Sequence, residues 1–455
     1  METTSRRMMK LGVFLITSGH HIAAWRAPEA YSGGDFQEYV KLARLSEAAK
    51  FDMLFLADTL SSRISNLEIA SRNAHSFSAS LFEPMTLLGA LSAVTERIGL
   101  VATASTTFMQ PYNLARQFAS LDHVSAGRAG WNIVTTVDDD SARNFGQAAG
   151  LEHEDRYARA EECVDVVRAL WNSWEDDAII RDQEEGRFFR PSGVHSTDHH
   201  GRYFDVAGPL NIPRPPQGHP ILVQAGASGL GRALAARVAD VIFTASPGLD
   251  EAMTFYRDIK QRATGAGRDP DHVLVMPGIT PVIGTTRADA QSKLDRLHAM
   301  IDLDLALNTL QNFMPDIDLR ALPLDEPLTE LPITNAQQSR QTLAMDMARR
   351  DNLTLRQLAH RFAGQRGHWC PTGTAFEVAD QMEEFFVSHG ADGFNIMPSV
   401  FPTMLEDFVE LVVPELQRRG LFRTEYEGRT LRENLGLPFQ ALLANEEQPK
   451  AEATS

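Results

Sequence analysis

Residues 125–136 read SAGRAGWNIVTT. Two glycines, Gly127 and Gly130, precede a β-branched run that extends from Ile133 to Thr136. Glycine reaches backbone conformations that a Cβ atom forbids, and β-branched residues favour strands. The stretch therefore predicts a buried strand that follows a sharp turn and ends on polar side chains, with the intervening tryptophan packing near the turn.

Seven further apolar runs look like this strand, at residues 11–16, 51–57, 97–106, 219–226, 239–246, 273–284 and 393–398. Near-continuous apolar runs are typical of a buried parallel sheet. Amphipathic helical patterns lie between many of them, at residues 35–50, 84–97, 154–174, 228–239, 250–263 and 374–390. Strands that alternate with helices in this way predict an α/β fold, a (β/α)8 TIM barrel.

The gaps after the fourth and seventh strands are much longer than the others. The spacing predicts a single barrel domain over residues 1–440, with insertions at about 137–218 and 285–372. Long insertions on a barrel usually lie at its carboxyl end, so we expect both to act as lids. Residues 441–455 lack apolar periodicity and are predicted to be a disordered tail.

The composition excludes several classes of function. A net charge of −17, without a basic run longer than a pair, argues against a nucleic-acid partner. No apolar run approaches the roughly 20 residues of a membrane span. The beginning, SRRMMKLGVFLITSG, superficially looks like a twin-arginine leader, but its short apolar part favours a first strand. Two cysteines, Cys163 and Cys370, suit a reducing compartment, so we expect a cytoplasmic protein, although a disulfide stays open.

Polar residues follow the predicted strands at the end where barrel active sites form. Asp58, Thr103, Asn132, Thr135 and Asn395 lie at or near these ends. Most of them form hydrogen bonds but do not ionise. Such a set suits the binding of a polar cofactor better than acid–base chemistry of its own.

The fifth strand is followed by AGASGLGRALAARVAD, in which Ser228 and several glycines begin a helix. Free backbone N–H groups at a helix start, together with a serine hydroxyl, can bind a phosphate. A simple turn with an N-cap is the alternative. The stretch is a weak match to a dinucleotide fingerprint, and Leu230 excludes a nucleophile elbow.

Histidines raise three further possibilities. His153 and Tyr157, four apart at the start of a predicted helix, could reach one ligand, although a helix-terminal histidine is more often a cap or surface residue. The cluster at 195–200 suggests a metal, but it has no paired second cluster, so no metal site is predicted. His20, Trp25 and Arg26 follow the first strand and could line a substrate pocket; alternatively, the tryptophan covers the core and the arginine pairs with a surface acid.

Over nearly its whole length the chain resembles the reduced-flavin monooxygenases of the nitrilotriacetate monooxygenase component A type, within the bacterial luciferase-like clan. The motifs that carry the resemblance are FLAD (55–58), residues 103–136, HEDRYARAEE (153–162), residues 199–228 and GADGFNI (390–396).

The resemblance implies that FMN lies over the carboxyl end of the barrel. It implies that Asp58 and Thr103 lie near polar atoms of the ring or ribityl chain, and Thr135 close to the ring. The residues that it implies around the ribityl phosphate are His153, Tyr157 and Ser228. The glycines of the first stretch would then serve the fold and its threonines the cofactor.

The resemblance also implies the chemistry. Reduced FMN (FMNH2), supplied by a separate NAD(P)H:FMN oxidoreductase, would react with O2 to give a C4a-hydroperoxide that transfers one oxygen atom to a small-molecule substrate. The flavin would carry the chemistry, so no catalytic residue is assigned. A homo-oligomer, dimer or tetramer, is expected.

The substrate stays open. Nitrilotriacetate would be oxidised next to its amine nitrogen, and its carboxylates should meet cations such as Arg26, His20, His21 and Arg128. Apolar residues near Phe108 and in the second insertion would instead suit an aryl sulfone, a thioether or an alkane. A deazaflavin-dependent hydride transferase, a non-catalytic flavin-binding protein and a nucleotide-sugar or NAD enzyme are the rival hypotheses.

Overall fold

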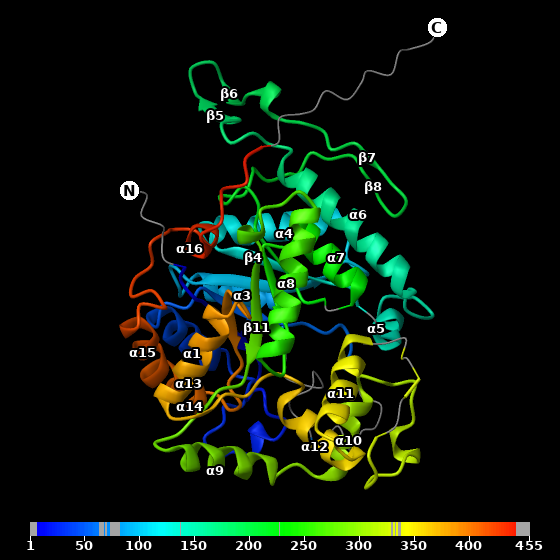
Figure 1. Cartoon of the computed structure of the whole chain (residues 1–455). Coiled ribbons are helices and arrows are strands. Elements are labelled where there is room, and N and C mark those ends of the chain that lie inside the picture. Colours follow the sequence, from blue (N-terminus) through cyan, green and yellow to red (C-terminus); the bar gives the residue numbers. More distant parts are fainter. Residues whose placement is uncertain are drawn as a thin grey trace.

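The structure, a computed structural model, describes residues 7–62, 68, 71–72, 82–136, 138–226, 228–328, 331–332, 334 and 338–442. Among these residues, eight parallel strands close into a barrel in the order β1, β2, β3, β4, β9, β10, β11 and β14 (Figure 1). The strands are β1 (Lys10–Leu15), β2 (Met53–Leu56), β3 (Gly99–Ser105), β4 (Ala129–Val134), β9 (Ile221–Gln224), β10 (Val241–Thr244), β11 (Leu274–Ile279) and β14 (Gly393–Ile396). Each overlaps one of the eight apolar runs, so the predicted (β/α)8 barrel is confirmed.

Side chains of each strand alternate between two cores. In β3, Leu100, Ala102 and Ala104 face outward and belong to the large cluster shared with the helices. Val101 belongs to the cluster inside the barrel. Because both faces are buried, the strands read as continuous apolar runs.

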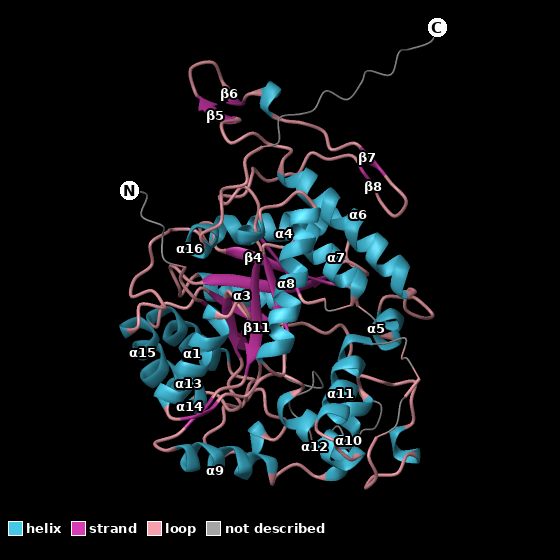
Figure 2. Ribbon diagram, viewed as in Figure 1, coloured by secondary structure: helices cyan, strands magenta, loops and turns pink. Residues whose placement is uncertain are grey.

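Helices surround the barrel (Figure 2). The main ones are α1 (Phe36–Ala48), α3 (Pro84–Ser92), α4 (Pro111–Val124), α6 (His153–Trp171), α7 (Gly229–Val238), α8 (Leu249–Gly265), α13 (Ala375–Val387), α14 (Thr403–Asp407) and α15 (Val413–Arg418). A π-helical turn at Phe408–Val412 joins the last two. Side-chain caps begin several of them: Asp35 accepts from the N–H of Gln37, and Thr374 forms a capping box with Glu377. Helix α4 was not among the helices predicted from the sequence.

The glycines of residues 125–136 serve the fold, as expected, but in two different ways. Gly127 has φ +88°, a conformation that favours glycine. Gly130 needs space instead, because a Cβ there would lie 2.9 Å from Cγ2 of Val101 inside the barrel. The first glycine makes the turn and the second allows close packing of β4 against β3.

Trp131 packs in a different place from the one expected. It is fully buried against Phe118 of α4, with ring centroids 5.6 Å apart, and its Nε1 donates to the carbonyl of Ala104 at 3.1 Å. It therefore lies between the barrel and its helical layer rather than at the closed end, because alternate residues of β4 face outward.

A short helix, α16 (Leu431–Leu435), closes the amino end of the barrel. Leu431 and Leu435 belong to the cluster inside the barrel. Arg432 between them forms a buried ion pair with Asp240, Nη2 to Oδ2, at 3.0 Å. The end opposite the predicted site is thus sealed by apolar side chains and a buried charge pair.

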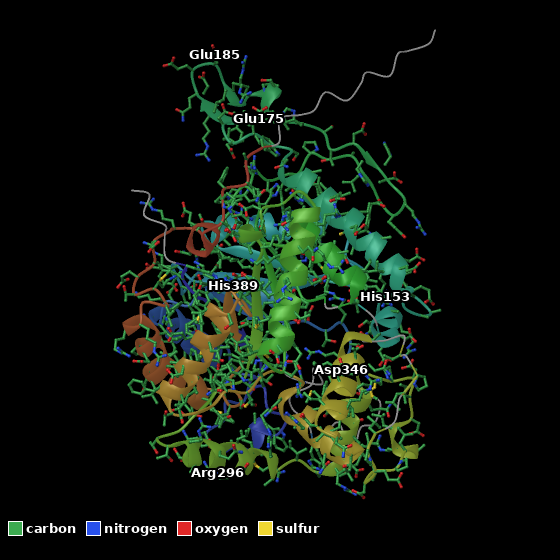
Figure 3. The ribbon with its side chains drawn as sticks, viewed as in Figure 1. His153, Glu175, Glu185, Arg296, Asp346 and His389 are labelled. Atoms are coloured by element: carbon green, nitrogen blue, oxygen red, sulfur yellow. The ribbon has the colours of Figure 1, made fainter. Side chains whose placement is uncertain are left out.

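The chain between β4 and β9 contains α5 (Asp139–Asn144), α6 and two hairpins. These are β5 (Ile179–Asp182) with β6 (Arg187–Phe189), and β7 (His199–His200) with β8 (Asp205–Val206). A 3-10 turn at Pro191–Gly193 separates them. The β5–β6 hairpin lies at the same end as α16, and Figure 3 places Glu175 and Glu185 at the opposite end from Arg296. The turn of the β7–β8 hairpin instead reaches back along α6 to its first turn, where Tyr203 Oη donates to Oδ1 of Asp155 at 2.9 Å. The expected position at the carboxyl end is therefore wrong for the β5–β6 hairpin, because α6 runs antiparallel to β4 and returns the chain to the amino end.

The chain between β11 and α13 lies at the end toward which β11 points (Figure 1). It comprises β12 (Val282–Ile283), α9 (Arg287–His298), α10 (Leu303–Gln311), α11 (Gln338–Arg350), α12 (Leu355–Gln365) and β13 (Thr372–Gly373). A 3-10 turn at Leu319–Ala321 follows α10. Leu310 and Phe362 form a separate core with Ile22, from the loop after β1. This insertion is positioned as a cover for the carboxyl end.

Residues 10–15 of the leader-like beginning form β1. Residues 443–455 of the predicted tail lie outside the described residues. None of the described helices is both long enough and apolar enough to span a bilayer. Cys163 and Cys370 are free thiols, so the disulfide that the sequence left open does not form.

Candidate active site

The loops after β2 and β4 are joined at the carboxyl end of the barrel. Ser61 Oγ donates to Oδ1 of Asp138 at 2.7 Å. Asp58, directly after β2, is half-buried and accepts from the N–H of Thr59 at 2.8 Å. The pKa of Asp58 is raised to about 6, chiefly by burial and less by the charge of Glu83, while the hydrogen bond from Thr59 opposes the shift.

The ends of β3 and β4 form a row of paired hydroxyl and amide groups. Thr103 Oγ1 accepts from Nδ2 of Asn132 at 2.8 Å, and both residues are buried. Ser105 Oγ and Thr136 Oγ1 lie 2.7 Å apart. Thr135 is the first residue after β4, next to Thr136 in the sequence, and its side chain is half-buried. The row can hold polar atoms of a ligand without supplying a charge.

The N-terminus of α7 is built around Ser228. Its Oγ accepts from the N–H of Gly231 at 3.1 Å and donates to Oη of Tyr157 at 3.4 Å. A Cβ at Gly231 would lie 2.9 Å from Oη of Tyr157 and 2.9 Å from Cα of Gly226. The glycines of this turn are therefore required for α6 to approach it.

His153 is the first residue of α6, and its ring centroid lies 5.0 Å from that of Tyr157 (Figure 3). Burial, and then the charge of Arg156, lowers the pKa of His153. Arg159 anchors this helix by donating to the carbonyl of Thr107 at 3.2 Å. The structure thus brings together the three residues predicted around a phosphate: His153, Tyr157 and Ser228.

The donor set at this turn fits the phosphate of FMN. A helix of ten residues contributes the positive end of its dipole, and the Cβ direction of Gly229 meets nothing within 4 Å. The hydroxyls of Ser228 and Tyr157 and the imidazole of His153 add side-chain hydrogen-bonding groups. All of these can contact an anion that approaches the first turn from the carboxyl end of the barrel.

The loop after β1 carries four residues considered for substrate binding, of which two are buried and two are exposed. The buried pair is His20 and His21, and the exposed pair is Trp25 and Arg26. His20 Nε2 lies 2.7 Å from the carbonyl oxygen of Phe14, and burial lowers the pKa of both His20 and His21 to about 3. Trp25 is 44% exposed. Arg26 is exposed and donates to the carbonyl of Met300 at 2.7 Å, a backbone group rather than the surface acid of the alternative interpretation.

The prediction that Arg128 could contact the substrate is wrong. Its guanidinium is buried at the amino end, where it caps the carbonyls that precede β3 and β4. It donates to the carbonyl oxygens of Ser92 (3.1 Å), Thr95 (3.0 Å), Ile98 (2.7 Å) and Ser125 (2.7 Å). A residue that precedes a barrel strand lies at the end away from the site.

The histidine cluster at 195–200 contacts carboxylates instead of converging on one point. The pairs are His195 with Glu175 at 2.9 Å, His199 with Glu162 at 3.1 Å and His200 with Asp205 at 3.0 Å. Within the described ranges, no three His, Cys, Asp or Glu side chains are placed to hold a metal ion.

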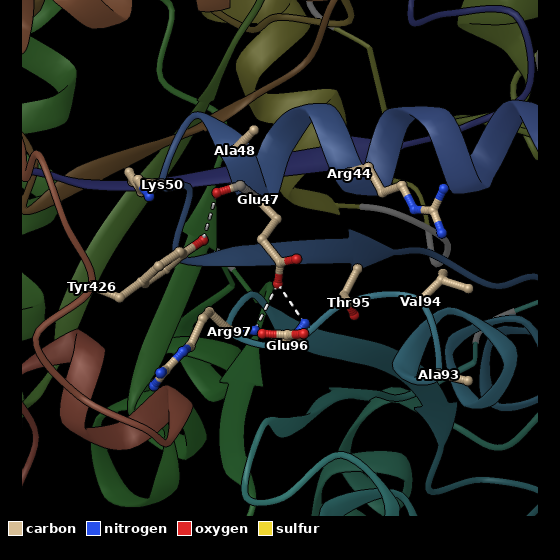
Figure 4. A pocket seen from close by; sticks show the side chains of 10 residues that line it. All are labelled: Arg44, Glu47, Ala48, Lys50, Ala93, Val94, Thr95, Glu96, Arg97 and Tyr426. Atoms are coloured by element: carbon tan, nitrogen blue, oxygen red, sulfur yellow. Dashed lines mark hydrogen bonds between the residues drawn. The ribbon is translucent and has the colours of Figure 1, made fainter.

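A surface pocket lies at the amino end, between the ends of α1 and α3 (Figure 4). Glu47 stands in it and accepts from the backbone N–H groups of Glu96 (2.8 Å), Arg97 (2.6 Å) and Ile98 (3.0 Å). Tyr426 donates to the carbonyl of Phe51 at 2.7 Å beside it. Its polar groups hold together the turns that enter β2 and β3, and it lies on the opposite side of the barrel from Ser228.

Two residues of the second insertion were not predicted to belong to the site. His368 contacts the carbonyl oxygen of Gly278 in β11 at 3.1 Å, and Arg340 contacts His368 at 3.3 Å. The sequence carries no signal for this pair, because the two residues are isolated in segments whose mutual packing only the structure shows.

The chain is similar to known proteins over the barrel and this site. Residues 9–393 match the luciferase-like monooxygenase family model. The chain is 50% identical over 439 residues to N-acetyl-S-(2-succino)cysteine monooxygenase of Bacillus subtilis, covering 96% of this chain and 98% of that protein. It is 45% identical over 440 residues to nitrilotriacetate monooxygenase component A of Aminobacter aminovorans, covering 95% and 97%.

The fold agrees with these matches. The crystal structure of riboflavin lyase with modified FMN and riboflavin has a TM-score of 0.86 and 31% identity, covering 95% of this chain and 96% of that one. The residues matched by the family model include the turn at Ser228 and the start of α6. The chain is therefore an oxidoreductase and belongs to the luciferase-like monooxygenase family.

Proposed function

We propose that the chain is the oxygenase of a two-component system that uses FMNH2 and O2 to oxidise a small organic substrate. A separate NAD(P)H:FMN oxidoreductase supplies the reduced flavin, as the words "component A" in the name of one relative suggest. The observation that carries the proposal is the convergence of His153, Tyr157 and Ser228 at the N-terminus of α7.

In this proposal the chain holds the cofactor and excludes water. His153, Tyr157, Ser228 and the first turn of α7 bind the phosphate. Asp58, Thr103 and Thr135 contact polar atoms of the ring or ribityl chain. The helices of residues 285–372 cover the opening, which favours transfer of oxygen to the substrate over its release to water. When bound, the reduced flavin supplies the activation of O2 and the oxygen atom.

Two relatives name the first substrates to test, nitrilotriacetate and N-acetyl-S-(2-succino)cysteine. An aryl sulfone, a thioether without carboxylates or an alkane is the alternative. That alternative is favoured by one observation, the stacking of Phe108 on Phe145 at a centroid distance of 4.9 Å beside the end of β3.

Oxygen-18 incorporation tests the proposal. The full chain is incubated with each substrate, ¹⁸O2, and FMNH2 regenerated by an unrelated flavin reductase with catalase present. We expect one ¹⁸O atom in the product, detected by mass spectrometry, and none when oxidised FMN replaces FMNH2. Oxidation of FMNH2 with no ¹⁸O in the product of any substrate would contradict the proposal.

The same experiment separates the rival hypotheses. A deazaflavin-dependent hydride transferase would transfer deuterium from reduced deazaflavin to the substrate without taking up ¹⁸O. A non-catalytic flavin-binding protein would bind FMN and give neither label in any product.

A further inference from the structure

Two histidines stand at the carboxyl end of the barrel, over aromatic rings of its interior. The ring of His368 lies 5.6 Å from that of Phe243, and the ring of His20 lies 4.6 Å from that of Phe14. The two phenylalanine rings are 6.0 Å apart. The second insertion, which carries His368, and the loop after β1, which carries His20, therefore meet over the centre of the barrel.

Arg340, in the first turn of α11, holds His368 in one tautomer. Its Nη2 lies 3.3 Å from Nε2 of His368, and an arginine can only donate, so Nε2 accepts. The hydrogen is then on Nδ1, which donates to the carbonyl oxygen of Gly278 at 3.1 Å. Arg340 Nη1 donates to the carbonyl oxygen of Arg366 at 2.6 Å. These contacts fix the guanidinium beside β11.

The half-buried guanidinium of Arg340 has no anionic partner in the described part of the chain. Other arginines of α11 differ: Arg350 pairs with Glu251 at 2.8 Å and Arg349 with Asp346 at 3.2 Å. Burial lowers the pKa of Arg340 to about 10, which leaves it charged at neutral pH. A charge removed from water without a counterion is costly and is compensated by an anion.

The imidazoles closest to Arg340 are neutral, so they neither add to its charge nor compensate it. Burial lowers the pKa of His368, and the charges of Arg340, His20 and Arg366 lower it further, so the imidazole is neutral. His20 is neutral for the same reason, with Arg366 again contributing. The charge of Arg340 therefore stands without compensation at the carboxyl end of the barrel, in a chain of net charge −17.

We propose that Arg340 binds a carboxylate of the substrate, so that the enzyme acts on organic acids rather than on neutral sulfones, thioethers or alkanes. The inference rests on the proposed function, since it takes the carboxyl end of the barrel as the site of oxidation. The flavin phosphate is assigned elsewhere, to the turn at Ser228. His368 positions the guanidinium, and the carboxylate supplies the missing counterion.

Calorimetry on the full chain, with and without oxidised FMN, tests the inference without turnover. The probes are nitrilotriacetate, N-acetyl-S-(2-succino)cysteine and the neutral trimethyl ester of the latter. We expect wild type to bind at least one acid about tenfold more tightly than the ester. Arg340→Gln should weaken binding of that acid by about 10- to 100-fold and leave the ester unchanged.

Three controls complete the design. Arg340→Lys keeps the charge and should lose less affinity for the acid than Arg340→Gln. Arg350→Gln, on the same helix but already paired with Glu251, should bind like wild type. The Kd of FMN should stay within about twofold in every variant, because a larger change would place Arg340 at the flavin phosphate.

Equal affinity of wild type for acid and ester overturns the inference, and so does failure to bind either acid. An Arg340→Gln variant that binds acid like wild type also overturns it, as does one that loses FMN instead. These results are independent of ¹⁸O incorporation. Acid binding that depends on Arg340, without oxygen transfer, would leave this inference standing and remove only the proposed function.

Discussion

The hydroxyl oxygens of Ser228 and Tyr157 lie 3.4 Å apart, although the two residues are 71 positions apart in the chain. The contact joins the N-terminus of α7 to the first turns of α6. It forms because Gly226 and Gly231 leave no Cβ between the helices. An anion at this turn therefore meets groups from two separate parts of the barrel.

Replacing Ser228 by aspartate should weaken FMN binding about tenfold or more, because a carboxylate repels the phosphate at the same N-cap. Aspartate is a good N-cap, so α7 should stay folded. Ser228→Ala removes one hydroxyl and should cost a few-fold only. Fluorescence titration of oxidised FMN measures both. Unchanged affinity in Ser228→Asp would remove this turn from the phosphate site.

Asp58 should make folding less favourable as the pH rises from about 4 to 6. Its pKa is raised by burial to about 6 in the folded chain, against 3.8 when exposed. The folded state therefore binds the extra proton in this window, and stability falls through it and levels off above pH 6. Asp58→Asn should raise the unfolding free energy at pH 7 by about 1–2 kcal/mol, after allowing for partial exposure.

Urea unfolding at pH 4 and pH 7 checks this prediction. The difference between Asp58→Asn and wild type should be present at pH 7 and small at pH 4. Asp325→Asn is the matched control, since Arg356 lowers the pKa of Asp325, which reverses the sign. A parallel pH dependence of wild type and Asp58→Asn would show that Asp58 does not titrate in this range.

The sequence was sufficient for the strands because burial on both faces leaves little choice of residue. Helix α4 was missed although Leu114, Phe118 and Leu121 repeat at helical spacing, so the signal was present. Helix α16 has five residues, too few for a period, and its function depends on the barrel that it closes. The β5–β6 hairpin was placed at the wrong end because length alone does not tell which end of a helix an insertion follows.

The residues of the candidate site also fall into two groups, those that the sequence could identify and those that it could not. Ser228 could be found because a helix start after a strand has a local signature, and Tyr157 because it shares a helix face with His153. Arg340 and His368 have no such signature. An uncompensated charge is a property of the surroundings, and these depend on how α11 packs beside β11.

Removing the buried charge of Arg432 should lower the unfolding free energy more than breaking an exposed ion pair. Its guanidinium contacts Asp240 at 3.0 Å and 3.3 Å, and both side chains are buried. Arg432→Met leaves Asp240 only the more distant guanidinium of Arg268, at 3.9 Å, and should cost about 3 kcal/mol. Arg356→Gln breaks an exposed pair with Asp325, which water and salt screen, and should cost far less. Urea unfolding monitored by circular dichroism measures both. Equal costs would show that α16 does not hold the closed end.

Gly130→Ala tests whether the second glycine of residues 125–136 is required by space alone. Its added Cβ would lie 2.9 Å from Cγ2 of Val101 and 3.3 Å from the carbonyl oxygen of Ile221. Val101 is completely buried inside the barrel, so it has little freedom to move, and overpacking should cost about 1–3 kcal/mol. Gly34→Ala is the control, because a Cβ there meets nothing within 4 Å and φ is not positive. Urea unfolding should show a loss for Gly130→Ala and almost none for Gly34→Ala. If the two variants were equally stable, β4 would have room beside β3, and this glycine would need another explanation than close packing.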